Sequence, residues 1–180
     1  MSRPAAGPTT GLATLSAVGG IALGAIALLA AAPDAARADA RTDCYQRSGE
    51  PAIRACTEAI GRNPGDVASY ISRAYEYYQK GELALSLADY GKAIEIDPKR
   101  WEAFHGRAWA YLKLDKAAEA LADAEAAVRL EPKSAYALDV RGHALEALGR
   151  REEALAAYRR ALALEPRLEG SKAGVKRLGQ

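Results

Sequence analysis

The stretch Trp101–Ser134, WEAFHGRAWAYLKLDKAAEALADAEAAVRLEPKS, decides the fold because a complete copy of it lies on each side. A shift of 34 positions places Pro132 on Pro98 in one direction and on Pro166 in the other. The same shift aligns further sets of residues, which are Ala93, Ala127 and Ala161, then Arg73, Arg107 and Arg141, then Tyr77, Tyr111 and Leu145. A fixed period of this length is typical of stacked supersecondary units. The sequence therefore predicts a repeat array.

Each unit has the pattern of two α-helices of about a dozen residues. In the central unit Phe104, Ala108 and Tyr111 are four and three positions apart, which places them on one helical face. The pattern is then interrupted by glycine or aspartate, which tolerate the left-handed conformation that ends a helix, at Gly81, Asp115 and Gly149. A proline closes the second helix, because the residue before it is pushed out of the helical conformation. The sequence thus predicts an all-α protein.

Small residues where the helices cross, aromatic residues on either side and a proline near the end of each unit resemble the tetratricopeptide-repeat (TPR) family. The resemblance covers about Ala40 to Leu168 and keeps one register through three consecutive copies. It implies an α-solenoid, in which antiparallel helix pairs stack into a right-handed superhelix with a concave groove. Along the chain this gives a degenerate first repeat at 39–66, full repeats at 67–100, 101–134 and 135–168, and a C-terminal capping helix at 169–180.

The chain departs from the family at a position where the family often has leucine and this sequence has Arg73, Arg107 and Arg141. The stem of an arginine can pack while its head reaches an acid. Asp89 and Asp123 lie at matching positions one unit earlier than the second and third arginines. We therefore predict ion pairs between units, Arg107–Asp89 and Arg141–Asp123, and none for Arg73.

Residues 1–38 have the layout of a secretory signal peptide. Arg3 and the amino terminus supply positive charge, and Ala36-Arg37-Ala38 is a small-x-small cleavage site. This layout predicts cleavage after Ala38 and a periplasmic or secreted bacterial protein. The alternative is an uncleaved inner-membrane anchor, because the uncharged stretch Leu12–Ala32 is just long enough to span a bilayer.

Cys44 and Cys56 lie 12 positions apart, on the two helices expected in the first repeat. Antiparallel helices would let the two thiols face each other. In an exported protein an even pair of cysteines predicts a disulfide. The alternative is two free thiols, one of them a small core residue.

Composition and spacing exclude several classes of function. The formal net charge of +2 gives no basic excess, so nucleic acid is not an expected partner, and a membrane is one only if residues 1–38 are retained. His105 and His143 lie far apart with no cysteine nearby, whereas a zinc site takes three or four protein ligands. No nucleophile, base and orienting group stand at a fixed spacing, and no phosphate-binding glycine loop is present. We expect no catalytic residue, no metal, no cofactor and no enzyme.

The resemblance places the first helix of each repeat along the concave groove. The residues it implies as a peptide-binding groove are Ile71, Tyr75, Tyr78, His105, Trp109, Tyr136, Asp139 and His143. Tyrosine and tryptophan are enriched at binding hot spots, although aromatic residues at helical spacing also pack between units, as we expect for Tyr77 and Tyr111. Some family members hold a C-terminal carboxylate with basic and asparagine side chains. This chain has other residues at those positions, Glu102, Gly106, Tyr136 and Val140, so we do not expect that kind of recognition.

These expectations combine into a protein- or peptide-binding scaffold of the bacterial cell envelope, acting through the groove of a short TPR solenoid. The alternative is a structural or assembly protein that acts by self-association, or by tethering through an uncleaved N-terminal helix.

Overall fold

The structure is a computed structural model that describes residues 34–179, with side chains from Ala40 onward. Most of the predicted leader, residues 1–33, lies outside the described residues. Within the described range the chain forms nine α-helices and no strand. They are α1 (Asp34–Gln46), α2 (Glu50–Arg62), α3 (Val67–Lys80), α4 (Leu83–Ile96), α5 (Trp101–Lys113), α6 (Ala117–Leu130), α7 (Ala135–Ala147), α8 (Arg151–Leu164) and α9 (Glu169–Leu178).

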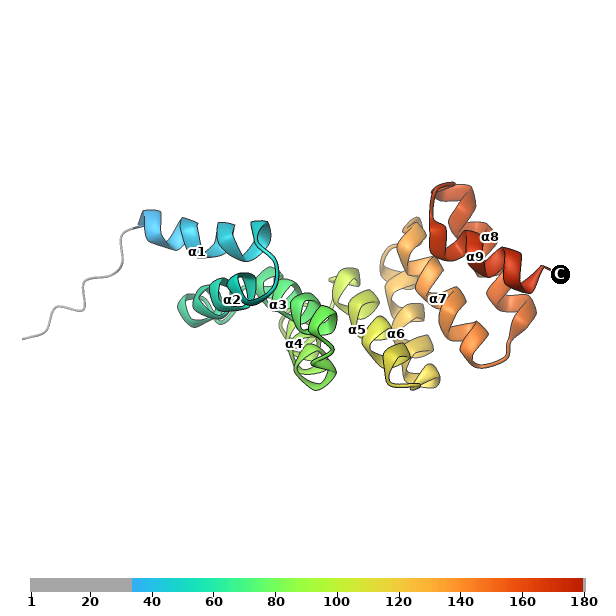
Figure 1. The fold of residues 1–180 in the computed structure, drawn as a ribbon, viewed down its shortest axis with the longest axis horizontal. Helices are drawn as coiled ribbons and strands as arrows, with labels where there is room; N and C mark the ends of the chain where they lie inside the picture. The colour runs from blue at the N-terminus through green and yellow to red at the C-terminus, as the bar shows by residue number, and fades with distance from the viewer. Residues whose placement is uncertain (1–33, 180) are drawn as a thin grey trace, which may run out of the picture. The chain divides into compact units, whose positions relative to one another are not determined.

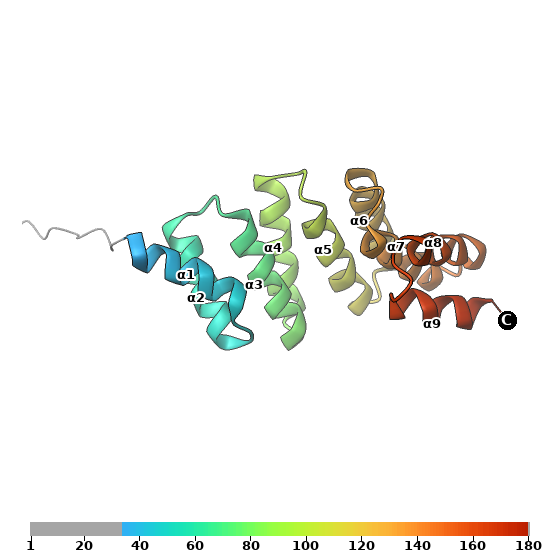
Figure 2. The ribbon, with the colours of Figure 1, turned by 90° about the horizontal axis from the view of Figure 1, so that it is seen from above.

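The helices form antiparallel pairs that follow one another along the chain (Figure 1). Each helix packs against the next one, and the odd-numbered helices α1, α3, α5, α7 and α9 also contact each other in series. The same succession is visible from above (Figure 2). The predicted all-α array of helix pairs is therefore confirmed.

The predicted helix ends are also confirmed. Gly81 and Gly149 follow α3 and α7 with positive φ angles of 79° and 72°. Asp115 occupies the same position after α5 with φ 56°, and it is the one non-glycine residue with positive φ in the described part of the chain. After each second helix, the residue before proline is no longer helical, and its N–H still donates to the helix, as at Asp97, which bonds the Ala93 carbonyl at 2.9 Å.

Helix α9 is more than a cap, because it begins one repeat length after α7, as α7 does after α5. Its Gly174 stands at the position that Gly106 holds in α5. The helix packs against α7 and α8 in the way that a further first helix would. Within the described residues, the last helix of the array is therefore the counterpart of a first helix.

Two of the three arginines pair inside their own hairpins, so the predicted pairs Arg107–Asp89 and Arg141–Asp123 between units are wrong. Arg73 Nε lies 2.7 Å from Asp89 Oδ2, and Arg107 Nε lies 2.7 Å from Asp123 Oδ2. The reason is that facing residues of an antiparallel hairpin are mirrored about its turn. Arg73 and Asp89 are equally distant from Gly81 along the chain. The third arginine, Arg141, has an alanine at its mirrored position and instead lies 4.0 Å from Glu125 of the preceding hairpin.

Pairs of large and small residues fill the space between successive repeats. The ring of Tyr158 fits between Gly142 and Gly174, where an added Cβ would lie 2.5 Å and 2.3 Å from ring atoms. Tyr90 lies against Gly106 in the same way, with a corresponding distance of 2.2 Å. The middle repeat has Ala124 and Val140 at the equivalent positions, both buried in one apolar cluster. A ring therefore faces a glycine, and an alanine faces a valine.

A search of the described helices for a membrane span found none that is both long and apolar enough.

Candidate functional site

A cleft of about 840 Å³ opens along α1, α3 and α5. Helix α3 supplies most of one wall and α5 the other, α1 and the turn after it supply the N-terminal end, and α4 contributes one tyrosine. The lining residues are Cys44, Tyr45, Arg47, Ser48, Ile71, Ser72, Tyr75, Glu76, Tyr78, Gln79, Tyr90, Glu102, His105, Gly106 and Trp109.

The walls are largely aromatic. The side chain of Tyr75 is 50% exposed, and Gln79 Nε2 donates to its hydroxyl at 2.7 Å. The Lys113 ammonium stands 4.1 Å from the centre of the Tyr78 ring. Rigid amphipathic rings offer contact area at a small loss of side-chain entropy. The aromatic walls are therefore suited to holding part of another chain.

His105 is a neutral acceptor inside this cleft. The Trp109 indole N–H donates to His105 Nε2 at 3.1 Å, so the proton of the imidazole lies on Nδ1. Burial lowers the pKa of His105 to about 4, against an opposing effect of Glu102. At neutral pH the ring brings no positive charge into the cleft, and its hydrogen bond holds the Trp109 indole in place.

Two acids and one base supply the formal charge of the lining. Glu76 on α3 accepts a hydrogen bond from the Gly49 N–H at 2.6 Å. Glu102 lies 3.3 Å from Arg100, and Arg47 lies 3.0 Å from Asp43. The acids therefore outnumber the bases among the lining residues, and the Lys113 ammonium lies over the ring of Tyr78.

Tyr90 forms part of the floor, where it fits because Gly106 has no side chain. Burial raises the pKa of Tyr90, and the nearby Tyr75 and Tyr78 add to the effect. Its hydroxyl makes no hydrogen bond to another described residue, whereas every described polar side-chain atom that is fully shielded from solvent has a partner. The Tyr90 hydroxyl therefore faces the cleft.

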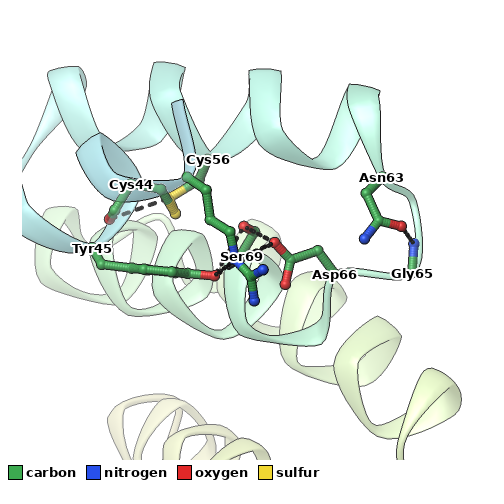
Figure 3. A network of polar contacts seen from close by, with 8 residues as sticks. Cys44, Tyr45, Cys56, Asn63, Gly65, Asp66 and Ser69 are labelled. Carbon is green, nitrogen blue, oxygen red and sulfur yellow. Dashed lines mark hydrogen bonds and ion pairs between the residues drawn. A yellow bond between two sulfur atoms is a disulfide. The ribbon is translucent and has the colours of Figure 1, made fainter. Parts of the chain in front are cut away.

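The N-terminal end of the cleft is held by a covalent bond and a polar network (Figure 3). Cys44 and Cys56 form a disulfide between α1 and α2, as the sequence predicted. The Tyr45 hydroxyl donates to Asp66 Oδ2 at 3.4 Å, and the Ser69 hydroxyl donates to the same oxygen at 2.9 Å (Figure 3). These contacts fix α1 against α2 and the start of α3, so the wall that α1 provides is rigid.

The structure places five of the eight predicted groove residues in the cleft and three outside its lining. The structure brings five of them together in the cleft, which are Ile71, Tyr75, Tyr78, His105 and Trp109. Tyr136 lies beside them, 54% exposed, with its ring centre 6.5 Å from that of His105. Asp139 and His143 do not line the cleft: Asp139 is buried and accepts from the Ser171 hydroxyl of α9 at 2.6 Å. The His143 ring packs 4.9 Å from Trp109 and 5.2 Å from Tyr158. Binding by any of the eight stays a prediction.

The sequence reasoning missed the contributions of α1 and of the cleft floor. Tyr45 and Arg47 were not considered because the degenerate first repeat does not follow the period. Tyr90 lies on a second helix, whereas the resemblance points only to first helices as groove residues. The signal that could have found it is the glycine at 106, which stands where the next repeat has Val140.

The fold and the cleft together define a helical-hairpin repeat protein with an open cleft along its first helices. Family models described as "TPR repeat" match residues 74–115, and models described as "Tetratricopeptide repeat" match residues 102–134 and 135–168. The chain belongs to the tetratricopeptide-repeat family. No curated protein matches the sequence significantly.

The described residues contain no group of three or more His, Cys, Asp or Glu side chains placed to hold a metal ion.

Several solved structures of peptide-binding relatives are similar. The first TPR of Spaghetti (RPAP3), bound to the HSP90 peptide SRMEEVD, is 30% identical with a TM-score of 0.61, over 63% of this chain and 90% of that one. The second TPR domain of human RPAP3, in complex with the HSP70 peptide SGPTIEEVD, is 26% identical with a TM-score of 0.60, over 63% and 95%. YrrB, a TPR protein with an unusual peptide-binding site, is 27% identical with a TM-score of 0.64, over 70% and 65%.

Proposed function

We propose that this protein is a non-catalytic scaffold that binds a segment of a partner protein in the cleft between α1, α3 and α5. The observation that carries the proposal is the aromatic cleft of about 840 Å³ itself. Homology to TPR domains that bind peptides supports it. The scaffold works passively, because a preformed cleft loses little conformational entropy when the peptide enters.

We further propose that the protein works in the bacterial cell envelope. Two observations support this location: the signal-peptide layout of residues 1–38 and the Cys44–Cys56 disulfide, since disulfides persist in oxidising compartments. N-terminal sequencing of the protein isolated from its host tests it. A chain that begins at Asp39 supports cleavage, and one that keeps residues 1–38 supports the anchored alternative.

The binding role is tested by crosslinked pull-down from the native envelope with cleft and control variants. Tyr75→Ala and Trp109→Ala remove aromatic surface from the cleft and should abolish capture of the partner. The control is Leu85→Ala on α4, because Leu85 is 48% exposed, close to the value for Tyr75, but does not line the cleft. Circular dichroism should give the same helicity for all the chains. Undiminished capture by both cleft variants would refute the proposal.

The alternative role, self-association, makes a different prediction for the same variants. Light scattering would then give a mass that rises with concentration and that does not respond to Trp109→Ala. The scaffold proposal expects a mass independent of concentration in the absence of partner.

A further inference from the structure

We propose that the cleft selects a basic side chain, an arginine or lysine of the bound segment, whose stem packs on the tyrosine rings and whose charge pairs with Glu76. This inference rests on the proposed peptide-binding function and names the chemistry of its ligand. It is carried by a buried carboxylate without a counter-charge, by the remaining charges of the cleft and by the aromatic surface around them.

Glu76 is unlike the other buried acids of the described chain, which are Asp66, Asp89, Asp123 and Asp139. Two of these form ion pairs with arginines inside their hairpins, and Asp66 lies 3.3 Å from Arg41. Asp139 accepts from Ser171 and lies 3.8 Å from His143. Glu76, only 9% exposed, has no lysine, arginine or histidine in ion-pair contact among the described residues.

One oxygen of Glu76 is available to a ligand. Oε2 accepts from the Gly49 N–H at 2.6 Å, and no described residue bonds Oε1. Since every fully shielded polar side-chain atom of the described chain has a partner, Oε1 is open to the cleft that Glu76 lines. A carboxylate with little access to water and no counter-charge is costly, and a cation brought to it recovers that cost.

The remaining charges of the lining do not compete for this role. Glu102 lies beside Arg100, and Arg47 beside Asp43, so each already has a partner of opposite charge. His105 is a neutral acceptor held by Trp109. The Lys113 ammonium is held over the ring of Tyr78. Glu76 is therefore the one acid of the lining without a partner of opposite charge among the described residues.

The aromatic surface suits the same ligand. A cation over the face of a tyrosine is attracted by the ring quadrupole, and the chain already shows this at Tyr78, where the Lys113 ammonium lies 4.1 Å from the ring centre. The Tyr90 hydroxyl on the cleft floor adds an oxygen that can accept from an ammonium or guanidinium. Tyr75, half exposed, can cover the aliphatic stem.

The relatives with acidic peptides make the contrast plain. Two similar structures hold peptides that end in EEVD. In this chain the cleft lining includes the acids Glu76 and Glu102, so an acidic peptide would be repelled there. The surface is complementary to the opposite charge.

The test compares two peptides on the full-length chain by calorimetric titration. The first is the acetylated, amidated heptapeptide Ser-Leu-Leu-Arg-Leu-Leu-Ser, and the second has citrulline at the centre, which keeps the shape of arginine without its charge. We expect the arginine peptide to bind about tenfold more tightly, the ratio that one charge-assisted contact gives. Equal affinities would overturn the inference, as would tighter binding of the citrulline peptide.

A pair of variants locates the effect at Glu76. Glu76→Gln keeps an acceptor for the Gly49 N–H and removes the charge, so the arginine-to-citrulline ratio should fall to about one. The control Glu119→Gln removes an equal charge from an exposed position on α6 and should keep the ratio. An unchanged ratio in Glu76→Gln would assign the selectivity elsewhere and overturn the inference. If no peptide binds, the inference falls, while the pull-down with Tyr75→Ala still decides the binding role separately.

Discussion

Tyr90 and Tyr158 hold the same position two repeats apart, yet one ring borders an open cleft and the other is sealed. Both rings lie against a glycine of the following first helix, Gly106 or Gly174. The Tyr158 hydroxyl donates to Glu146 at 2.8 Å, and Glu146 is in turn bonded by Arg177 of α9 at 2.5 Å.

Around Tyr90, aromatic residues stand in place of the acid and the arginine that bond near Tyr158. Tyr78 stands where the C-terminal repeat has Glu146, and Trp109 stands where it has Arg177. Neither replacement bonds the Tyr90 hydroxyl. The same backbone thus closes on itself where an acid and an arginine meet, and it leaves an open cleft where two rings take their places. Side chains at two repeat positions decide which of the two occurs.

The two ends of the described solenoid are also secured differently, and the largest expected effect follows from this. Helix α1 is tied by the Cys44–Cys56 disulfide, and α9 by side-chain bonds such as Ser171 to Asp139. Replacing both cysteines by alanine should lower the free energy of unfolding by about 3 kcal/mol. The cross-link restricts the unfolded chain, and this is the size of the effect expected for a loop with a sequence separation of 12. Denaturant unfolding measures the change, and hydrogen exchange should rise in α1.

Ser171→Ala provides the matched change at the other end. It should accelerate exchange in α9 and cost about 1 kcal/mol, the usual net value of one hydrogen bond. If the double cysteine variant lost no more free energy of unfolding than Ser171→Ala does, the disulfide would not be what secures the N-terminal wall of the cleft.

The pairing of ring with glycine is expected to give the next largest effect. Gly106→Val would place a Cβ 2.2 Å from the Tyr90 ring, and such overpacking costs about 2 kcal/mol. Combining it with Tyr90→Ala recreates the Ala124 and Val140 pair of the middle repeat. The double variant should recover most of the loss in thermal unfolding, and additive losses would show that the two positions are not coupled.

Much of the fold could be predicted because the residues that begin and end its helices recur at a fixed interval. The prolines, and the helix breaks such as Gly81 and Asp115, recur at one interval, and each acts through its own backbone preference. The arginine partners were missed because the period was applied to a contact that obeys a different symmetry. A hairpin mirrors residues about its turn, which relates Arg73 to Asp89, whereas a shift by one repeat relates positions that lie in successive units.

The cleft could be predicted only in part. Five of the eight proposed groove residues meet there, since the family register places first helices along the inner face. Asp139 does not join them because Ser171 of α9 bonds its carboxylate, and His143 lies behind Trp109, packed between that ring and Tyr158. The acid that we propose as the anchor, Glu76, shows its importance only through a missing counter-charge, which is a property of three-dimensional packing.

The smallest expected effect bears most directly on the comparison of the two tyrosines. Tyr158→Phe removes the hydroxyl that donates to Glu146 and should lower the free energy of unfolding by about 1 kcal/mol. Tyr90→Phe removes a hydroxyl without a partner among the described residues and should change stability by less than about 0.5 kcal/mol. Denaturant unfolding of the two variants measures the difference under identical ring packing.

The same pair of variants separates stability from binding. Tyr90→Phe should lower the affinity for the arginine peptide, because the hydroxyl on the cleft floor no longer accepts from the guanidinium. Tyr158→Phe should leave the affinity for that peptide unchanged. A stability loss of equal size in both variants would mean that the Tyr90 hydroxyl is as firmly bonded as that of Tyr158. The N-terminal position would then be sealed in the same way, and the cleft would lose the polar floor on which its proposed selectivity partly depends.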